Sequence, residues 1–328
     1  MALLASGQAA ALSQYTASGI TSPNLTTLAV TDWTTGGASC GVAATTSNAT
    51  NGDDFEICAT SVTYAAGGTS PITGKITLNM GGGTLTLPDS LTLSGNLWVF
   101  NATLALGSST LTMPAGSTLQ NGKNITMGSG GITFGAGSTL DHYGSGALFT
   151  AGTGTITFNG GGTISSAATG LALELNDVVS TAGLIINHAA AGASVKIGRN
   201  LTIGGNVTGT GELILPNATH TVTSTVPSVT ISSLLSVSTG AQTITLVPAS
   251  TAGNSITISS YGTIGGTVTV ACTGGVFTGS VTGATATLGA SGGSFTCTKA
   301  NTITPVSASI NLLSNEKPVI FAEEVEMK

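Results

Sequence analysis

The chain has 328 residues, of which 13 are acidic and 7 are basic, so its formal net charge at neutral pH is -6. Only 6% of the residues are charged, which excludes the basic face that nucleic acid or an anionic lipid surface requires. Hydrophobic residues make up 41% of the chain, which excludes a disordered polymer. No apolar run approaches the roughly 20 residues of a membrane-spanning helix, so no membrane span is predicted.

Residues 1–70 are predicted to form an N-terminal helix followed by a small cap. Leu4, Leu12 and Tyr15 fall roughly on one helical face, which favours a helix over residues 1–15. From there to residue 70 the periodicity is poor, and we interpret this part as a β cap pinned by a disulfide. A cap is expected because the end of a stacked β structure is an exposed sheet edge.

A repeated phrase organises the next part of the chain. Ala-Gly-Ser-Thr-Leu ends at Leu119 and again at Leu140, and the same offset carries Leu111–Met113 onto Ile132–Phe134. A slightly longer step carries the second triplet onto Ile156–Phe158. Each triplet places two apolar side chains on one face of a short strand and Thr on the other. The pattern predicts an all-β fold, a parallel β-solenoid of about 20–24 residues per rung.

The predicted solenoid shaft covers residues 71–304. Its period becomes looser beyond residue 170, where the pairs Leu171/Val195 and Ile244/Val268 keep the same step as Ile132/Ile156. Glycine-rich segments separate the strands and are expected to form the corners of each rung, because glycine tolerates positive φ and close approach of backbones.

The four cysteines form two local pairs, Cys40 with Cys58 and Cys272 with Cys297. The separation of the second pair is close to one rung, which would stack the two residues at about the 4.8 Å spacing of neighbouring strands and within disulfide reach. Two disulfides predict an oxidising, extracellular or cell-surface location. The alternative is four buried free thiols.

Residues 305–328 are predicted to form a charged C-terminal tail strand. Six of the charged residues surround the apolar run Val319, Ile320 and Phe321. Such a strand could cover the C-terminal edge of its own solenoid or pair with the edge of a neighbouring copy, and the sequence leaves both possibilities open.

Few residues are candidates for catalysis or for binding a metal or cofactor, and we predict no enzyme, no cofactor and no metal. The acidic residues before the tail do not pair at the rung offset. His142, His188 and His220 lack metal-ligand spacing and are interpreted as surface residues. The acidic cluster of Asp53, Asp54 and Glu56 is interpreted as a polar loop, with a cation site as the less favoured alternative.

Two further polar patterns have a possible function. Thr-x-Thr pairs, such as Thr155/Thr157 and Thr221/Thr223, are typical of flat Thr arrays on ice-binding solenoids, but the pairs do not recur at one rung offset, so no continuous Thr face is predicted. Asn-x-Thr sequons are candidate glycosylation sites in a secreted protein. The candidate asparagines are Asn24, Asn48, Asn101, Asn124, Asn200, Asn206 and Asn217.

The rung text GGGTLTL, PAGSTL, GAGSTLDHYG and GTGTITFNGGG resembles the right-handed β-solenoid passengers of bacterial surface adhesins, of the filamentous-haemagglutinin and autotransporter type. The resemblance covers roughly residues 75–270. It implies a right-handed, elongated, surface-displayed scaffold that serves adhesion or fibre formation.

These observations predict a structural subunit of an extracellular filament or cell-surface fibre, with a possible adhesion role. Its expected partners are copies of itself, joined through an open rung edge or the tail strand, and host-surface or matrix glycans. One alternative is a carbohydrate-binding or carbohydrate-cleaving β-helix that resembles a phage tailspike. A less favoured alternative is ice binding.

Overall fold

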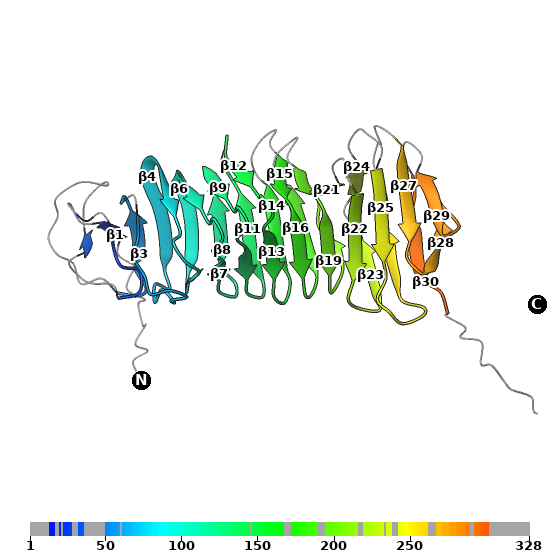
Figure 1. Ribbon diagram of the computed structural model, residues 1–328, viewed down its shortest axis with the longest axis horizontal. Coiled ribbons are helices and arrows are strands. Elements are labelled where there is room, and N and C mark those ends of the chain that lie inside the picture. The colour runs from blue at the N-terminus through cyan, green and yellow to red at the C-terminus, as the bar shows by residue number, and fades with distance from the viewer. Residues whose placement is uncertain are drawn as a thin grey trace, which may run out of the picture.

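A computed structural model shows an elongated rod of stacked strands (Figure 1). The structure describes residues 13–16, 20, 22–27, 32–35, 50–59, 61–144, 146–166, 172–188, 194–215, 219–232, 234–237, 242–261, 267–288 and 292–301. Within these ranges the strands are the only extended regular elements, and there is no α-helix. The predicted all-β, parallel β-solenoid is confirmed.

The described strands belong to three sheets that run along the rod. Sheet 1 contains β2 (Trp33–Thr35), β1 (Ser13–Thr16), β3 (Asp54–Ile57), β4 (Lys75–Thr86), β6 (Asn96–Ala105), β8 (Thr118–Asn121), β11 (Ser138–His142), β14 (Gly162–Ser166), β17 (Leu184–His188), β20 (Val207–Thr208), β23 (Ser228–Ile231), β26 (Ser255–Ile258), β30 (Phe295–Lys299) and β28 (Gly275–Gly279), with β9 (Asn124–Thr126) and β12 (Leu148–Thr150) as a branch. Sheet 2 contains β5 (Leu91–Thr92), β7 (Leu111–Met113), β10 (Ile132–Phe134), β13 (Thr155–Phe158), β16 (Asp177–Ser180), β19 (Asn200–Ile203), β22 (Thr219–Ser224), β25 (Gln242–Val247), β27 (Val268–Cys272) and β29 (Thr285–Leu288). Sheet 3 contains β15 (Ala172–Leu175), β18 (Ser194–Ile197), β21 (Glu212–Leu215) and β24 (Leu234–Val237).

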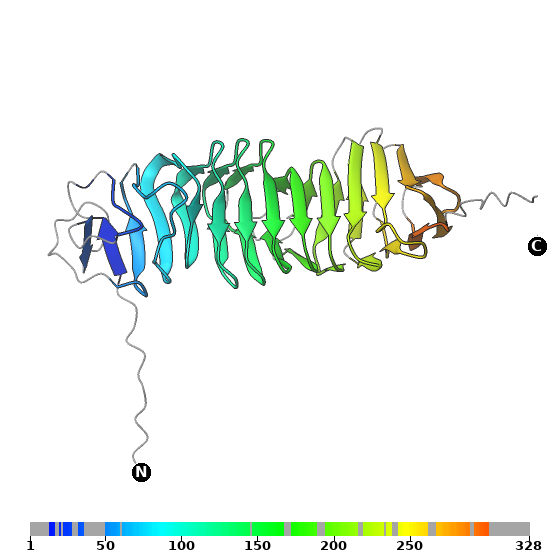
Figure 2. The same ribbon diagram turned by 60° about the horizontal axis from the view of Figure 1, so that its bottom comes forward.

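Successive turns of the chain add one strand to each side of the rod (Figure 2). Leu119 pairs with Leu140, and Ile132 pairs with Leu111 on one side and Ile156 on the other, as the repeat predicts. The strands pair in parallel along the shaft because each returns to the same side after one complete turn.

The length of a turn varies along the rod. The turn that carries Leu91 onto its partner Leu111 is clearly shorter than the turn that carries Ile231 onto its partner Ile258. The constant step that the sequence favoured beyond residue 170 is therefore wrong: Ile244 pairs with Val270 and not with Val268. Likewise Val195 pairs with Leu173 and not with Leu171. The corner segments differ in length, whereas the strands keep their register.

Inward apolar side chains form one core along the shaft. The two outer residues of each triplet are buried and the central Thr is partly exposed, for example in β7, β10 and β13. Phe134 and Phe158 stack on successive turns with ring centroids 4.8 Å apart and an interplanar angle of 9°. Burying each such side chain stabilises the fold by about 1.5–3 kcal/mol.

Glycine is required where the corners stack closely. Gly128 has φ of +65°, and a Cβ built there would lie 2.5 Å from the carbonyl oxygen of Gly107 on the preceding turn. At Gly152, on the following turn, a Cβ would lie 2.2 Å from the carbonyl oxygen of Gly128. A side chain at Gly128 or Gly152 would collide with backbone, so the short repeat depends on glycine as well as on the apolar triplets.

The N-terminal end is a β cap, and the end of the predicted helix is a strand in the structure. Residues 13–15, at the end of the helix predicted over residues 1–15, belong to β1, and residues 1–12 lie outside the described residues. Strand β1 pairs in parallel with β3 and antiparallel with β2. The buried Gln14 amide donates a hydrogen bond to Asp53 Oδ2 at 3.0 Å. Parallel pairing thus begins with β1 and β3, before residue 71.

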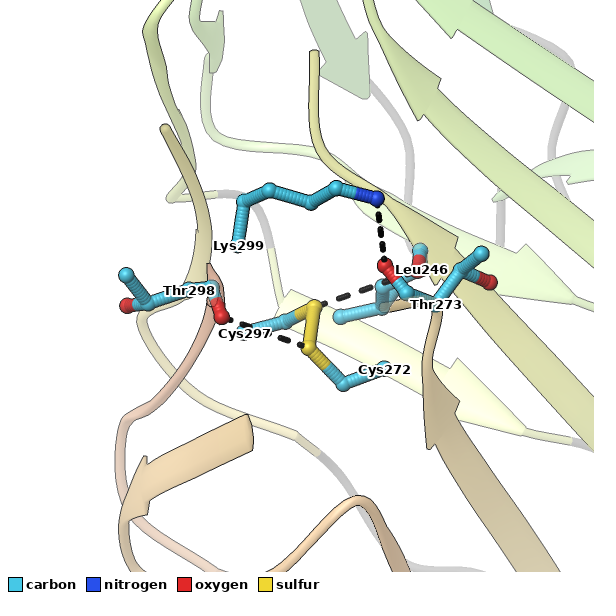
Figure 3. The surroundings of a disulfide bond; sticks show 6 residues. All are labelled: Leu246, Cys272, Thr273, Cys297, Thr298 and Lys299. Atoms are coloured by element: carbon cyan, nitrogen blue, oxygen red, sulfur yellow. Dashed lines mark hydrogen bonds between the residues drawn. A yellow bond between two sulfur atoms is a disulfide. The ribbon is translucent and has the colours of Figure 1, made fainter. Parts of the chain in front are cut away.

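The C-terminal end is closed by antiparallel strands and a disulfide. Strands β28, β29 and β30 reverse direction against the end of the shaft. Cys272 in sheet 2 and Cys297 in sheet 1 form a disulfide with Cα atoms 5.5 Å apart (Figure 3). The predicted pair is confirmed, but the reason was wrong: Cys272 stacks on Leu246 and Cys297 faces Ile256, so the bond joins two sheets and not two successive rungs.

Cys58 is also disulfide-bonded. Cys40, its predicted partner, lies outside the described residues. The tail strand predicted around Val319, Ile320 and Phe321 is likewise outside them.

Candidate functional site

The predicted glycosylation sites differ in how accessible their side chains are. Asn48 and Asn217 lie outside the described residues. Asn206 is exposed, and its side chain only accepts a hydrogen bond, through Oδ1 from Thr230 N at 2.9 Å. The other four are partly buried and hydrogen-bonded: Asn24, Asn101, Asn124 and Asn200. Asn206 is therefore the described sequon best placed to carry a glycan.

The histidines of the described shaft are not surface residues, contrary to the sequence interpretation. His142 is 1% exposed and His220 is fully buried, both on inward positions of strands. The side chain of His188 lies outside the described part, although its backbone pairs with that of Ser166. In the ranges that the structure describes, no three His, Cys, Asp or Glu residues gather into a metal-binding group.

His142 belongs to a buried polar column in sheet 1, where Asn121, His142 and Ser166 occupy equivalent positions on successive turns. Asn121 Nδ2 lies 3.1 Å from His142 Nδ1, and the imidazole Nε2 is buried without a hydrogen-bond partner. Burial lowers the pKa of His142, and the nearby Asp141 carboxylate opposes that effect more weakly. These surroundings favour a neutral His142 imidazole whose Nδ1 accepts a hydrogen bond from Asn121 Nδ2.

The outer face of sheet 2 carries a continuous row of β-branched residues. Each pairs in register with the next, over eight steps of about 4.8 Å, or roughly 38 Å in all. The row consists of Thr69, Thr92, Thr112, Thr133, Thr157, Val179, Thr202, Thr223 and Val247.

No continuous Thr face was expected, and the strand register shows a run of five threonines, from Thr69 to Thr157, beyond which Val179 and Val247 interrupt this Thr row. The sequence separations between its members vary, so the row is invisible at a fixed offset and emerges only from the strand register. The hydroxyls of Thr112, Thr133 and Thr157 make no hydrogen bond within the described protein, and these side chains are partly exposed. The members of the row are uncharged and offer methyl and hydroxyl groups to the solvent.

A second surface feature lies on sheet 1 around Trp98. A hollow of about 210 Å³ is lined by Lys75, Asn96, Trp98, Thr118 and Gln120, with Leu97 at its base. The indole of Trp98 lies 4.6 Å from the ring of Phe100, centroid to centroid, and Lys75 Nζ lies 5.3 Å from the indole centroid. Nothing in the sequence pattern singles out this hollow, because its residues come from three different turns.

A third surface feature is a hollow of about 350 Å³ on the side of the rod that carries sheet 3. Strands β12 and β15 follow each other there without a hydrogen-bonded ladder. Ala151 and Gly152 line the hollow, which is rimmed by the ion pair of Lys196 Nζ and Glu174 Oε1 at 2.8 Å. The two small residues leave space next to Leu175, and the ion pair satisfies its own charges, so we interpret the hollow as a packing feature.

No protein-family profile, curated protein or solved structure matches the chain. Within the described ranges, no helix has the length and apolar character to span a membrane. The candidate functional surfaces are therefore the Thr row and the Trp98 hollow, judged on their chemistry alone.

Proposed function

We propose that the protein is a non-enzymatic structural rod of an extracellular filament or cell-surface fibre, with adhesion as an associated role. The observation that carries this proposal is the single core that runs from Leu25 to Cys297 between two closed ends. Such a stack is stiff because every turn contacts its neighbours through backbone hydrogen bonds and apolar columns. The disulfide at the C-terminal end supports an oxidising location.

The end structures bear on how copies would join. Antiparallel strands lie at both ends of sheet 1, where β2 and β28 are the outermost strands. At the C-terminal end, Phe277 in β28 also donates a backbone hydrogen bond to Gly283, which covers part of that edge. We therefore assign the joining role to the tail, residues 305–328, which carries the apolar run Val319–Phe321.

Negative-stain electron microscopy of the full chain tests this assignment. Unbranched fibres of uniform width are expected, and they should disappear when Val319 and Phe321 are both replaced by Asp. Replacing Glu323 and Glu324 by Gln is the matched control, because it changes the tail without adding charge to the apolar run. Discrete rods from the wild-type chain would refute fibre formation, and fibres from the Asp variant would refute the tail route.

Ice binding is a second candidate function, which the Thr row specifically favours. Sheet 1 also carries outward threonines in register, Thr118, Thr139 and Thr163, but that row is shorter and is followed by Ile185. Trp98, Gln120 and Asp141 occupy another outward row of sheet 1. The row itself offers methyls and hydroxyls without charge, which suits ordered water, and Asp177 stands in the adjacent row of the same face of sheet 2.

Thermal hysteresis and inhibition of ice recrystallisation test the second candidate. The wild-type chain should show both effects, and Thr157→Tyr should remove them because a bulky ring interrupts the row at its centre. Thr163→Tyr, on the outer face of sheet 1, is the control and should retain both. If the wild-type chain shows neither effect, the Thr row does not bind ice.

A further inference from the structure

The Trp98 hollow lies on the side of the rod, where β4, β6 and β8 run next to one another. We infer that this hollow is a binding site for a neutral sugar ring within a glycan. The inference stands on the side chains of the hollow and is independent of whether the rods assemble into fibres.

Two amide groups in the hollow are held in defined orientations. Asn96 Oδ1 accepts a hydrogen bond from Thr118 N at 2.7 Å, which leaves Asn96 Nδ2 as a donor. Gln120 Nε2 donates to Asp141 Oδ2 at 3.0 Å, which leaves Gln120 Oε1 as an acceptor. Because each sugar hydroxyl both donates and accepts, a fixed donor next to a fixed acceptor suits a ring bearing adjacent hydroxyls.

The indole of Trp98 supplies the apolar side of the site. A sugar ring has C–H groups on its faces and hydroxyls at its rim, so it combines stacking on an aromatic face with hydrogen bonds at the edge. The hollow has that composition, because the amides of Asn96 and Gln120 and the hydroxyl of Thr118 lie beside the indole.

The indole nitrogen of Trp98 is an unsatisfied donor, although the ring contacts Phe100 and Lys75. Such a buried donor without a hydrogen-bond partner disfavours the folded state. The indole fits because the next turn has glycine at 122, where a Cβ would lie 3.0 Å from Trp98 Nε1. The ring is partly exposed, so a ligand in the hollow can contact it.

The charges around the hollow favour a neutral ligand. Lys75 is the cation among its lining residues, and Lys75 Nζ lies 3.9 Å from Asp54 Oδ2. The carboxylate offsets the ammonium, so no net positive charge remains to attract an acidic sugar. Asp141 also lies at the Gln120 side of the hollow and would repel one. We therefore expect the hollow to bind neutral ligands, with an affinity that does not depend on salt concentration.

Affinity electrophoresis of the full chain tests the site with three neutral probes, a β-glucan, a galactomannan and a chitin oligosaccharide, and with polygalacturonate as the acidic comparison. We expect at least one neutral probe to bind and Trp98→Ala to weaken binding about tenfold or more. Trp98→Phe should retain most of the affinity because it keeps a stacking face. Ile185→Ala removes another exposed apolar residue of sheet 1 and should leave binding unchanged.

Three results would overturn the inference. The first is that no neutral probe binds. The second is that Trp98→Ala binds as tightly as the wild-type chain, which would place the site elsewhere. The third is that only polygalacturonate binds and that about 0.5 M NaCl abolishes the binding, which would make the recognition electrostatic. Circular dichroism of each variant confirms that the β fold is retained.

Discussion

Loss of the disulfide between Cys272 and Cys297 should destabilise the C-terminal end of the rod and little else. The bond closes a loop with a sequence separation of 25 residues. A cross-link over such a loop restricts the unfolded chain, and the loop-entropy relation gives about 3.5 kcal/mol at 25 °C. The double variant Cys272→Ala/Cys297→Ala should lose about that much stability in the region that the bond joins.

The loss should be local because a solenoid is stabilised turn by turn. The disulfide connects β27 in sheet 2 with β30 in sheet 1, and β30 pairs only with β26 and β28 among the described strands. Amide hydrogen exchange should therefore become faster in β28, β29 and β30. Exchange in β10 and β13, several turns away, should remain unchanged.

Alanine also removes two buried sulfur atoms, so the cross-link needs a separate control. In reductant the wild-type chain loses this bond and the Cys58 bond but keeps its sulfur atoms. The comparison is therefore confined to the C-terminal strands, which should exchange almost as fast as those of the double variant. Protection that falls equally along the whole rod would refute turn-by-turn stability. A double variant with wild-type protection would show that the antiparallel strands hold without the bond.

Three further perturbations follow from the packing. Gly116→Ala should lower the free energy of unfolding by about 1 kcal/mol, because φ is +69° with open space around the residue. Gly128→Ala should lower it by at least about twice as much, because a Cβ there meets the Gly107 carbonyl. Urea unfolding measures both, and equal losses would refute a steric requirement. Burial lowers the pKa of His142 from its ordinary 6.5, so the unfolded chain binds more protons and stability should be lost as the pH falls below that value. Urea unfolding at pH 7 and at pH 5 measures this loss, and His142→Gln should reduce it. An equal loss in the variant would exclude His142 as its source. After secretion from a glycosylating host, intact mass should show a glycan that Asn206→Gln removes, and an unchanged mass would place the glycan elsewhere.

The sequence was sufficient for the parts of the fold that depend on short-range pattern. The triplets at Leu111, Ile132 and Ile156 align in the structure as their spacing predicts. Two apolar residues around a Thr can only be buried together on one side of a strand, so the pattern specifies which face points inward. Stacking then follows, because a lone turn cannot bury its apolar face.

The relation between distant turns could not be predicted in the same way. Corner loops absorb insertions without disturbing the strands, so the step to the next turn is longer at Ile231 than at Leu91. A fixed offset therefore assigned Ile244 to the wrong partner and left the Thr row unseen. The disulfide was found from proximity along the chain, although its geometry, across two sheets, depends on strands that reverse direction.

The Trp98 hollow was beyond sequence reasoning for a different reason. Its polar groups become a site only because neighbouring turns place Lys75, Asn96, Thr118 and Gln120 around one indole. Taken separately, each is an ordinary outward residue of a strand. The relevant signal would have been the single tryptophan in a row whose neighbouring positions are Thr77 and Gln120, and that row is defined by register.

The inward and outward residues of the rod are subject to different physical constraints. Every inward column must be filled to the same density, so the three sides of the core have similar residues. The outward rows face only water, and they differ: sheet 2 carries Thr and Val in one row, whereas sheet 1 carries Trp, Gln and Asp in one row and Thr118, Thr139 and Thr163 in the next. Folding alone does not require this difference. Trp98 belongs to sheet 1 and the Thr row to sheet 2, so a substitution on one face should leave the other face intact, and the two surfaces can be tested independently.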